Sequence, residues 1–334
     1  MAAGEGGARR PLAVITDNRF GDSAIEREVL EPAGVELAVA SCRSSSDVAA
    51  AGREADALLV NLAPVDGAAI DCLERCKIIA RYGIGLDNVD VEAAARRGIA
   101  VANVPGYCDA EVGEHALALI LASARSLPLR DRGVRAGSWN AASANRRVEG
   151  SVLGVLGFGG TGRHLIKAAL GLGFREILVW SPHITEGRIE AAFGAAPAAL
   201  GAAVRPASLD ELLAASDWVS LHVPLKPETR GLVGRRELGL MKRDAVLVNV
   251  SRGAVVDEEA LVEALSAGRL GGAGLDVFVA EPLPQGSRLR SFPGVVLTDH
   301  SAYASRESIV ELRRRTAGNA LAALRAAGLA AAPS

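Results

Sequence analysis

Three segments of the sequence end an apolar run with an ionisable side chain. Arg252 follows "AVLVNVS", Glu281 lies in the loop "DVFVAEP", and His300 ends "VVLTDH". In an open parallel sheet the carboxyl ends of the strands meet at one edge, where ligands bind, so we expect these side chains to converge. An arginine can pair with a substrate carboxylate and polarise a ketone, a histidine can protonate the ketone oxygen, and a glutamate can orient that histidine. The three residue types together suit hydride transfer to a ketone.

Hydride transfer needs a carrier, and a glycine-rich stretch offers a place for one. "LGVLGFGGTG" supplies Gly157, Gly159 and Gly162 in a G-x-G-x-x-G pattern. The pattern alone is weak in a chain with 37 glycines, but an apolar run precedes it and the helix-compatible "RHLIKAALGLG" follows it. Glycines at these positions let the backbone turn tightly and approach a pyrophosphate at a helix N-terminus. This context favours a dinucleotide site over a tight turn without a ligand.

The residue expected to contact the ribose is unusual. The run "ILVWSPHI" places Ser181 where a dinucleotide-binding unit normally has an acidic residue on the ribose 2′-hydroxyl. A serine offers one hydrogen bond and removes the negative charge that would repel a 2′-phosphate, and His183 and Arg188 could supply positive charge to such a phosphate. NAD and NADP both remain open. The absence of an arginine next to Ser181 favours NAD slightly, with relaxed discrimination.

The order of the apolar runs indicates which elements position these residues. Short apolar runs alternate with helix-compatible stretches, which is typical of parallel βαβ units. The first series includes "LAVITD", "VELAVA", "ALLVNL" and "GIAVANVPG", and the second begins at "SVLGVLGFGGTG" and ends at "VVLTDH". A helix is expected from Ala110 to Arg125, a polar and weakly patterned region from Leu127 to Glu149, and an amphipathic helix over about 307–327. The sequence predicts an α/β protein of two doubly wound, Rossmann-like domains.

Several longer stretches together carry a family resemblance. They are "SDWVSLHVPLKPETRGLVG", "LVNVSRGAVVDEEALVEAL", "GAGLDVFVAEP", "LTDHSAYAS" and, in the first half, "ARYGIGLDNVDVEAAARRGIAVANVPGYCDAEVGEHALAL". Together they closely resemble the D-isomer-specific 2-hydroxyacid dehydrogenase family, in branches similar to the C-terminal binding proteins and the phosphoglycerate dehydrogenases. The resemblance covers about residues 55 to 317. It implies an NAD(P)-dependent oxidoreductase that interconverts a D-2-hydroxyacid and a 2-oxoacid.

The resemblance also implies an organisation of the chain. The active site is expected in the cleft between the two domains, with residues 1–109 plus 301–334 as the substrate domain and 110–300 as the dinucleotide-binding domain. A homodimer is implied, with the helix from Ala110 and the arm after it at the interface. No regulatory domain of the kind attached to many phosphoglycerate dehydrogenases is expected.

Residue roles follow from the resemblance position by position. Arg252 matches the arginine that binds the substrate carboxylate, Glu281 the glutamate that orients the histidine, and His300 the acid/base, all three being catalytic. Two of these residues, Arg252 and His300, are also expected to bind the substrate. The other expected substrate-binding residues are Ile84 and Gly85 in a loop and the neighbouring Tyr82. The cofactor-binding set combines the glycine turn with residues that line the nicotinamide side: Gly157, Gly159, Gly160, Thr161, Gly162, Ser181, His222, Val250, Ser251, Arg252, Asp276, His300 and, as a further contact, Cys108.

Some of these positions depart from the family's pattern or have a specific implied role. Asp276 matches an aspartate near the nicotinamide carboxamide, whereas Gly160 and Thr161 replace a basic-then-aliphatic pair in the turn. Tyr107 and Tyr303 are expected to shape the substrate pocket together with Tyr82. Two other functions stay open at this stage: an NAD(H)-binding sensor or scaffold like the C-terminal binding proteins, and a dehydrogenase of a related anion such as a phosphonate.

Composition limits the partners. The net charge of −2 and the isoelectric point near 6.3 give no electrostatic reason to expect nucleic acid or an acidic membrane. No apolar stretch is long enough for a membrane span, and the first ten residues lack the apolar region of a signal peptide, so we expect a cytoplasmic protein. Of the four cysteines only Cys72 and Cys76 are close together, without the further ligands of a zinc site, so no metal is expected.

Overall fold

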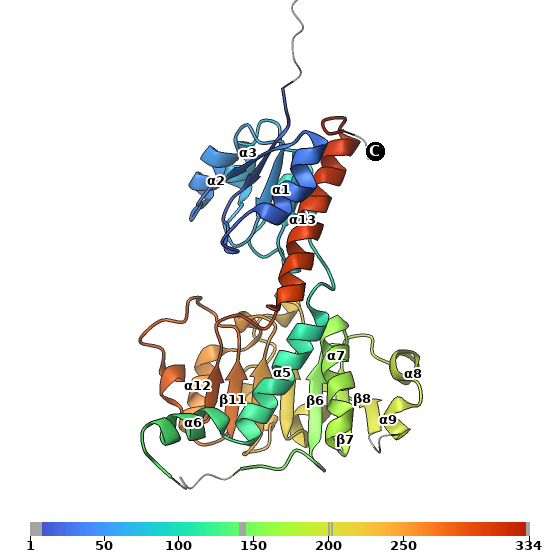
Figure 1. Ribbon diagram of the computed structural model, residues 1–334. Coiled ribbons are helices and arrows are strands. Elements are labelled where there is room, and N and C mark those ends of the chain that lie inside the picture. The colour runs from blue at the N-terminus through green and yellow to red at the C-terminus, as the bar shows by residue number, and fades with distance from the viewer. Residues whose placement is uncertain (1–8, 140–144, 200, 202, 332–334) are drawn as a thin grey trace, which may run out of the picture. The chain divides into compact units, whose positions relative to one another are not determined.

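The computed structural model describes residues 9–139, 145–199, 201 and 203–331. Contacts between Cα atoms divide the chain into two compact units, Met1–Tyr107 with Ser305–Ser334, and Cys108–Ala304. Each unit is built on its own parallel sheet (Figure 1), which confirms the α/β class expected from the sequence. The domain limits 1–109 with 301–334 and 110–300, and the roles attached to them, stay predictions.

The first unit has a five-stranded sheet in the order β2-β1-β3-β4-β5. Its strands are β1 (Leu12–Ile15), β2 (Glu36–Val39), β3 (Ala57–Val60), β4 (Ile78–Arg81) and β5 (Ala100–Ala102). Two helices that pack against each other lie on one face (Figure 1): α1 (Ala24–Leu30) and the last helix, α13 (Arg306–Ala326). The other helices of this unit are α2 (Ser45–Gly52), α3 (Gly67–Asp71) and α4 (Val91–Arg96), with a short 3-10 turn η1 (Glu31–Ala33) after α1.

The second unit has a seven-stranded sheet in the order β12-β11-β10-β9-β6-β7-β8. Its strands are β6 (Val152–Leu156), β7 (Glu176–Trp180), β8 (Ala203–Pro206), β9 (Trp218–Leu221), β10 (Val246–Asn249), β11 (Gly272–Leu275) and β12 (Val295–Leu297). Its α-helices are α5 (Asp109–Ala124), α6 (Leu127–Arg135), α7 (Gly160–Ala169), α8 (Glu186–Phe193), α9 (Ala196–Ala199), α10 (Leu209–Ala215), α11 (Arg235–Leu240) and α12 (Glu258–Ser266). Short 3-10 turns complete it: η2 (Leu170–Leu172), η3 (Pro227–Thr229), η4 (Gly253–Val255) and η5 (Arg288–Ser291).

Strand order in the second sheet marks the place where a nucleotide would bind. β6 pairs with β7 on one side and with β9 on the other, and all these pairings are parallel. After β6 the chain adds β7 and β8 on one side of this strand. It then returns and adds β9 and the later strands on the other side. Ligands of open α/β sheets bind at the carboxyl ends of the strands at such a switch point. In this sheet the glycine-rich stretch follows β6 directly.

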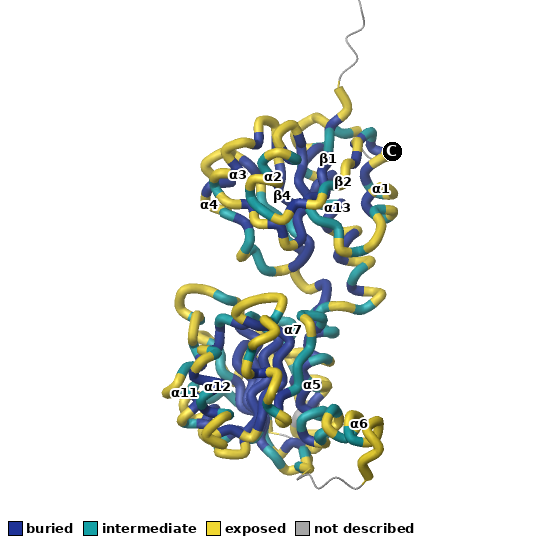
Figure 2. Tube along the Cα trace, turned by 90° about the vertical axis from the view of Figure 1, so that its left-hand side faces the viewer, coloured by how far each residue is buried: buried dark blue, intermediate teal, exposed yellow. Residues whose placement is uncertain are grey.

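The strands at the centre of each sheet are buried on both faces (Figure 2), which explains why they read as continuous apolar runs. Every residue of β3, β6, β9, β10 and β11 is buried. Helices cover both faces of a parallel sheet, so neither side of such a strand meets water. Trp218, at the start of β9, has no exposed surface, and its indole N–H donates to Ser151 Oγ at 3.1 Å.

Helix α6 is nine residues long and has no buried residue. Leu127 and Val134 on this helix are 54% and 57% exposed, and Trp139 just after it is 80% exposed. Figure 2 shows this arm as exposed and intermediate along its length. Over the residues that the structure describes, no helix combines the length and the apolar character needed to cross a membrane.

Candidate active site

The glycine turn after β6 is closed tightly against the end of β9. Gly157 has φ +111°, and a Cβ there would lie 2.4 Å from the carbonyl oxygen of His222. A Cβ on Gly162 would lie 2.3 Å from the carbonyl oxygen of Gly157, so a side chain fits at neither position. Gly159 precedes α7, and a Cβ at this residue would meet nothing within 4 Å. The turn thus leaves open space at the N-terminus of a ten-residue helix, and this arrangement fits a dinucleotide pyrophosphate.

The two residues that depart from the family's pattern have specific neighbours. A Cβ on Gly160 would lie 1.7 Å from Asp109 Oδ2, so the first residue of α5 occupies the space beside this glycine. The hydroxyl of Thr161 is 3.1 Å from Nδ1 of His222, and the other ring nitrogen is 2.9 Å from Ser220 Oγ. Thr161 therefore joins α7 to the end of β9 by a hydrogen bond, which an aliphatic side chain could not form.

His222 is held as a neutral side chain. It is 8% exposed, and burial lowers the pKa of its imidazole from 6.5 to about 3. Both ring nitrogens have hydroxyl partners, Ser220 and Thr161. A histidine that stays neutral and has both nitrogens engaged is unsuited to exchange protons with a ligand. Its place in the cofactor-binding set stays a prediction, supported by its position beside the glycine turn.

The loop after β7 holds a cation at His183, two positions beyond Ser181. The carbonyl of Ser181 accepts from the backbone N–H of Ile184 at 3.1 Å, and Arg188 Nη1 donates to the carbonyl of His183 at 3.0 Å. Thr185 caps α8 by accepting from the backbone N–H of Arg188. The guanidinium of Arg188 therefore lies over the loop that follows Ser181, although it is seven positions further along the sequence.

The glutamate and the histidine of the predicted triad are in contact. Nδ1 of His300 lies 2.7 Å from Oε2 of Glu281, and the other carboxylate oxygen accepts from the backbone N–H of Phe278 at 2.9 Å. Burial raises the pKa of the Glu281 carboxyl, but the hydrogen bonds from His300 and Phe278 outweigh it and hold this pKa below its usual value. The two side chains are 36% and 34% exposed, so the pair is accessible to a small molecule.

The backbone of His300 has φ +54°, a conformation that non-glycine residues rarely adopt. Asp276 holds it there. This carboxylate is 1% exposed, and it accepts from Thr298 Oγ1 at 2.7 Å, from Ser301 N at 3.0 Å and from Ala302 N at 3.0 Å. The resemblance assigns Asp276 to the nicotinamide carboxamide. In the structure both of its oxygens bind the segment that carries His300, a positioning role that the sequence did not indicate.

His115 is a further residue of this cluster that sequence reasoning missed. Its Nε2 lies 3.0 Å from Thr298 Oγ1 and 3.5 Å from Asp276 Oδ1. The helical pattern of α5 indicates only that His115 lies on a helix, and an interface or hinge role is the simplest interpretation from sequence. The packing of α5 against β10, β11 and β12 brings it to the His300 segment.

Arg252 is positioned by the last residue of β10. The side chain of Asn249, 1% exposed, donates to the carbonyl of Arg252 at 2.9 Å and accepts from the backbone N–H and hydroxyl of Ser251 at 3.0 and 2.9 Å. The positive charge of Arg252 is one of the causes that hold the pKa of the Glu281 carboxyl below its usual value. Val250 is buried. Asn249 was not recognised from sequence, because an amide inside an apolar run carries no motif.

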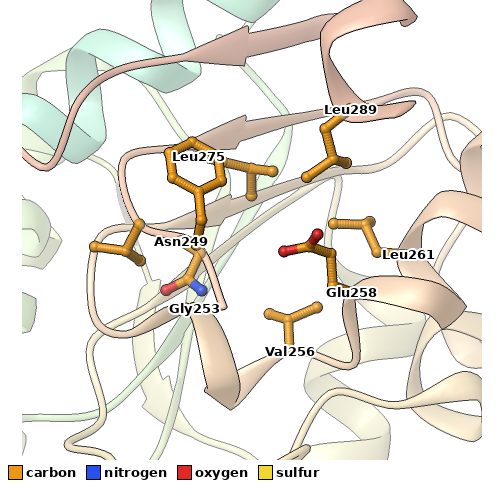
Figure 3. Close-up of a pocket in the computed structure, with 9 residues that line it drawn as sticks. Asn249, Gly253, Val256, Glu258, Leu261, Leu275 and Leu289 are labelled. Atoms are coloured by element: carbon orange, nitrogen blue, oxygen red, sulfur yellow. The ribbon is translucent and has the colours of Figure 1, made fainter. Parts of the chain in front are cut away.

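A small pocket backs the segments that carry Arg252 and Glu281 (Figure 3). Its lining is mainly apolar: Asn249, Gly253, Val256, Glu258, Leu261, Leu275, Val277, Phe278 and Leu289. Glu258 points into it and accepts weakly from the backbone N–H of Val279 at 3.4 Å. None of the residues predicted to bind substrate or cofactor lines this pocket, so it lies in the packing behind these two segments.

The predicted substrate loop belongs to the first unit, directly after β4. The carbonyl of Gly83 accepts from Val104 N at 2.9 Å, and the carbonyl of Ile84 accepts from Asn103 Nδ2 at 2.6 Å. Within the described part of the chain, the backbone N–H groups of Ile84 and Gly85 donate no hydrogen bond. Ile84 is 38% exposed. Because the carbonyls of Gly83 and Ile84 accept hydrogen bonds while the N–H groups of Ile84 and Gly85 donate none, the loop has two amides available to bind an anion.

The tyrosines and Cys108 lie in different surroundings. Tyr82 is 2% exposed, and its hydroxyl donates to Glu26 at 3.0 Å, so its side chain points into the first unit and can act on a ligand only through the loop. Tyr303 stands edge-on to the His300 ring at 6.3 Å, the placement expected of a pocket residue. Tyr107 and Cys108 are both buried. Over the described residues no cluster of histidine, cysteine and acidic side chains could hold a metal ion.

Comparisons with known proteins show which family has this sequence and fold. Residues 117–302 match the model of the D-isomer specific 2-hydroxyacid dehydrogenase NAD binding domain. The chain is 38% identical over 276 residues to the glyoxylate reductase of Korarchaeum cryptofilum, covering 81% of this chain and 80% of that protein. The crystal structure of a glyoxylate reductase from Paecilomyes thermophila superposes with a TM-score of 0.82 at 28% identity and covers 96% of each chain. That of Aquifex aeolicus D-lactate dehydrogenase, complexed with NAD and lactic acid, gives 0.80 at 26% identity, covering 95% of this chain and 96% of the other.

The fold and these comparisons define an oxidoreductase with an NAD-binding domain, acting on CH–OH donors. More particularly, the chain belongs to the D-isomer-specific 2-hydroxyacid dehydrogenase family, and the resemblance seen in the sequence is confirmed. It spans less than half of the D-3-phosphoglycerate dehydrogenases that it also matches, for example 47% of the protein from Mycobacterium tuberculosis.

Proposed function

We propose that this protein reduces a small 2-oxoacid to the D-2-hydroxyacid, and catalyses the reverse reaction, with His300 as acid/base. The contact between His300 Nδ1 and Glu281 carries the proposal. A nicotinamide cofactor, when bound, supplies or accepts the hydride. Because Nδ1 is engaged by the carboxylate, Nε2 is the nitrogen left to give a proton to the ketone oxygen and to take it back in the reverse direction. Glu281 fixes the ring orientation and stabilises the charged imidazole.

Arg252 and the loop amides are the proposed anion-binding groups. The guanidinium of Arg252 pairs with the substrate carboxylate and polarises the neighbouring ketone. The backbone N–H groups of Ile84 and Gly85 bind the same carboxylate, a role supported by their lack of acceptors in the described chain. Residues 1–109 with 301–334 would then supply substrate contacts, and residues 110–300 would hold the cofactor.

The glycine turn and its neighbours are the proposed cofactor site. Gly157 to Gly162 would hold the pyrophosphate at the N-terminus of α7, and Ser181 would contact the ribose by a single hydrogen bond. Val250, Ser251 and Cys108 keep their proposed places near the cofactor, and Asp276 contributes by holding His300. We propose NAD as the preferred cofactor because no arginine stands next to Ser181 in the sequence. NADP is accepted in this proposal because Ser181 carries no charge and Arg188 donates to the carbonyl of His183, two positions further on.

The glyoxylate reductases among the relatives favour glyoxylate as a first substrate to test. The deciding experiment is steady-state reduction of glyoxylate, hydroxypyruvate and bulkier 2-oxoacids, each with NADH and with NADPH. Turnover well above background supports the proposal. Tight NADH binding without turnover of any 2-oxoacid would contradict it and favour a sensor or scaffold instead. Oxidation of a phosphonate, with no reduction of 2-oxoacids, would assign the Arg252 site to another oxyanion.

A homodimer is the proposed assembly, formed through α5 and the α6 arm. The exposed Leu127, Val134 and Trp139 support it, because apolar side chains gathered on one short segment mark an interaction surface. Light scattering on the intact protein tests the mass, and V134D should shift it toward the monomer. Cytoplasmic location is part of the same proposal, supported by four cysteines that form no disulfide.

A further inference from the structure

The last helix of the chain, α13, reaches the substrate loop through a buried ion pair. Arg313 is 5% exposed, and its Nε and Nη2 donate to Glu26 Oε1 and Oε2 at 2.9 and 2.7 Å. Glu26, on α1, is 1% exposed and accepts from the hydroxyl of Tyr82 at 3.0 Å. Tyr82 directly precedes the loop that contains Ile84 and Gly85. One continuous chain of hydrogen bonds therefore joins α13 to the start of this loop.

A second chain of hydrogen bonds runs from α13 to the middle of the same loop. Asn319, two turns after Arg313, donates from Nδ2 to the backbone carbonyl of Asn103 at 3.1 Å. Asn103 in turn donates from its own Nδ2 to the carbonyl of Ile84 at 2.6 Å. The carbonyl of Ile84, which lies between the two available amides, is thus hydrogen-bonded to Asn103, and Asn103 is held by Asn319 of α13.

The buried ion pair between Arg313 and Glu26 has further partners that fix its geometry. Asp22 accepts from Arg313 Nη2 at 2.8 Å, and the ring of Phe20 lies 5.4 Å from the guanidinium and 5.3 Å from the ring of Tyr82. Apolar side chains could hold α13 against α1 at lower desolvation cost, so such a pair is better explained by the geometry that it fixes. Burial and the charge of Glu26 raise the pKa of Tyr82, which keeps its hydroxyl protonated as a donor.

We propose that α13 positions the oxoacid-binding loop, with Arg313 acting through Glu26 and Tyr82, and Asn319 acting through Asn103. This inference rests on the proposed function of the Ile84 and Gly85 amides. Arg313 and Asn319 are positioning residues: they touch neither substrate nor cofactor, and they set where the amides stand. Loosening either chain of hydrogen bonds weakens oxoacid binding and leaves the cofactor-binding unit unaffected.

The test uses Y82F and N319A in the full-length protein. Y82F keeps the ring and leaves Glu26 paired to Arg313, so it removes one hydrogen bond and no charge. Each variant should raise KM for glyoxylate about fivefold or more, in line with the loss of a hydrogen bond from a preorganised site. We expect kcat and the dissociation constant for NADH to change by less than about twofold.

Asp56 offers a matched control. It is a buried carboxylate of the same unit, 4% exposed, that accepts from Arg9 Nη2 at 2.6 Å and from Leu12 N at 2.7 Å. It precedes β3, so it lies at the opposite edge of the sheet from the loop. D56N should lower the thermal midpoint at least as much as Y82F and leave KM unchanged. This comparison separates positioning from general destabilisation.

The outcomes distinguish the two proposals. Wild-type turnover with an unchanged KM in Y82F and N319A, or with the same change in D56N, overturns the positioning role and leaves the proposed function standing. A wild-type protein that reduces no 2-oxoacid overturns the proposed function, and the positioning role with it. Should Y82F not fold, N319A carries the test, because Asn319 is only half-buried and the ion pair stays intact.

Discussion

His222 and His300 both follow strands of the second unit, at the edge of the sheet where the carboxyl ends meet. His222 is buried, has two hydroxyl partners and has a pKa of about 3. His300 is about one-third exposed and is paired with a carboxylate. The same residue type at the same edge is therefore held neutral in one place and paired with a carboxylate in the other, where we propose that it transfers a proton. Burial and the neighbouring groups decide the chemistry, and the strand-end position does not.

The largest expected effect comes from removing the accessible histidine. H300N should lower kcat for 2-oxoacid reduction by about a thousandfold, roughly 4 kcal/mol, because no other group replaces the proton donor. NADH binding, followed by fluorescence quenching, should stay within about twofold. H164N is the matched control, since His164 is an exposed histidine on α7 and is not among the predicted catalytic residues. Comparable activity in H300N and H164N would remove His300 from its role.

The partner of His300 should give the next largest effect. E281Q keeps the size of the side chain but removes its charge, so we expect kcat/KM to fall about 10- to 100-fold, or roughly 1.4 to 2.7 kcal/mol. The lowered pKa of Glu281 means that the carboxylate stays ionised until the pH falls below its usual range, so any stability from the pair is present above that range and is lost only in acid. Adding E281Q to H300N should cost little further activity. A full additional loss in the double variant would show that Glu281 acts separately from the histidine.

The buried histidine should affect stability and not catalysis. H222Q can keep amide contacts to Ser220 and Thr161, and kcat/KM should stay within about threefold. Because the folded-state pKa is depressed from 6.5 to about 3, the unfolded chain binds the extra proton first, and stability falls as the pH drops from 6.5 towards 3. Between pH 7 and pH 5 this site contributes a loss of up to about 2 kcal/mol that H222Q should remove.

Urea unfolding of the wild type and H222Q at the two pH values measures that contribution. An equal pH dependence in H222Q and the wild type would mean that His222 is accessible to protons in the folded protein. The distinction between the two histidines would then be lost.

The two histidines also show how far the sequence alone could go. His300 and Glu281 are 19 positions apart, yet the family's phrasing around each was specific enough to predict the pair, and the structure places them in contact. The alternation of strands and helices predicted both sheets, because parallel strands buried on two faces leave continuous apolar runs. A helix over 127–135 was not predicted, since its residues make no buried face and hence no apolar period.

Residues that act through other residues were the ones that sequence reasoning missed. His115 and the inward orientation of Tyr82 depend on contacts between distant segments, such as the 183 positions that separate His115 from Thr298. Asn249 contacts residues only two and three positions away, but an amide inside an apolar run carries no motif. Asp276 was recognised, but the partners of its carboxylate follow only from the fold of residues 298–302 around it. A motif records which residues are present, whereas a positioning role requires knowing which atoms meet.

The smallest expected effect is on the choice between NADH and NADPH, and it comes from the loop after β7, away from His300. R188A should lower kcat/KM with NADPH by about three- to tenfold, up to roughly 1.4 kcal/mol, and leave the value with NADH nearly unchanged, because only the 2′-phosphate would meet the guanidinium. S181D should act in the same direction by adding a negative charge and a second acceptor for the ribose. R163A is the control, since Arg163 is exposed on α7 and lies away from the loop after Ser181 in the sequence.

Wild-type preference for NADPH by more than about tenfold would reverse the NAD assignment and give the phosphate to Arg188. Equal losses with both cofactors in R188A would instead mean that this arginine supports the loop through His183 and does not discriminate between the two.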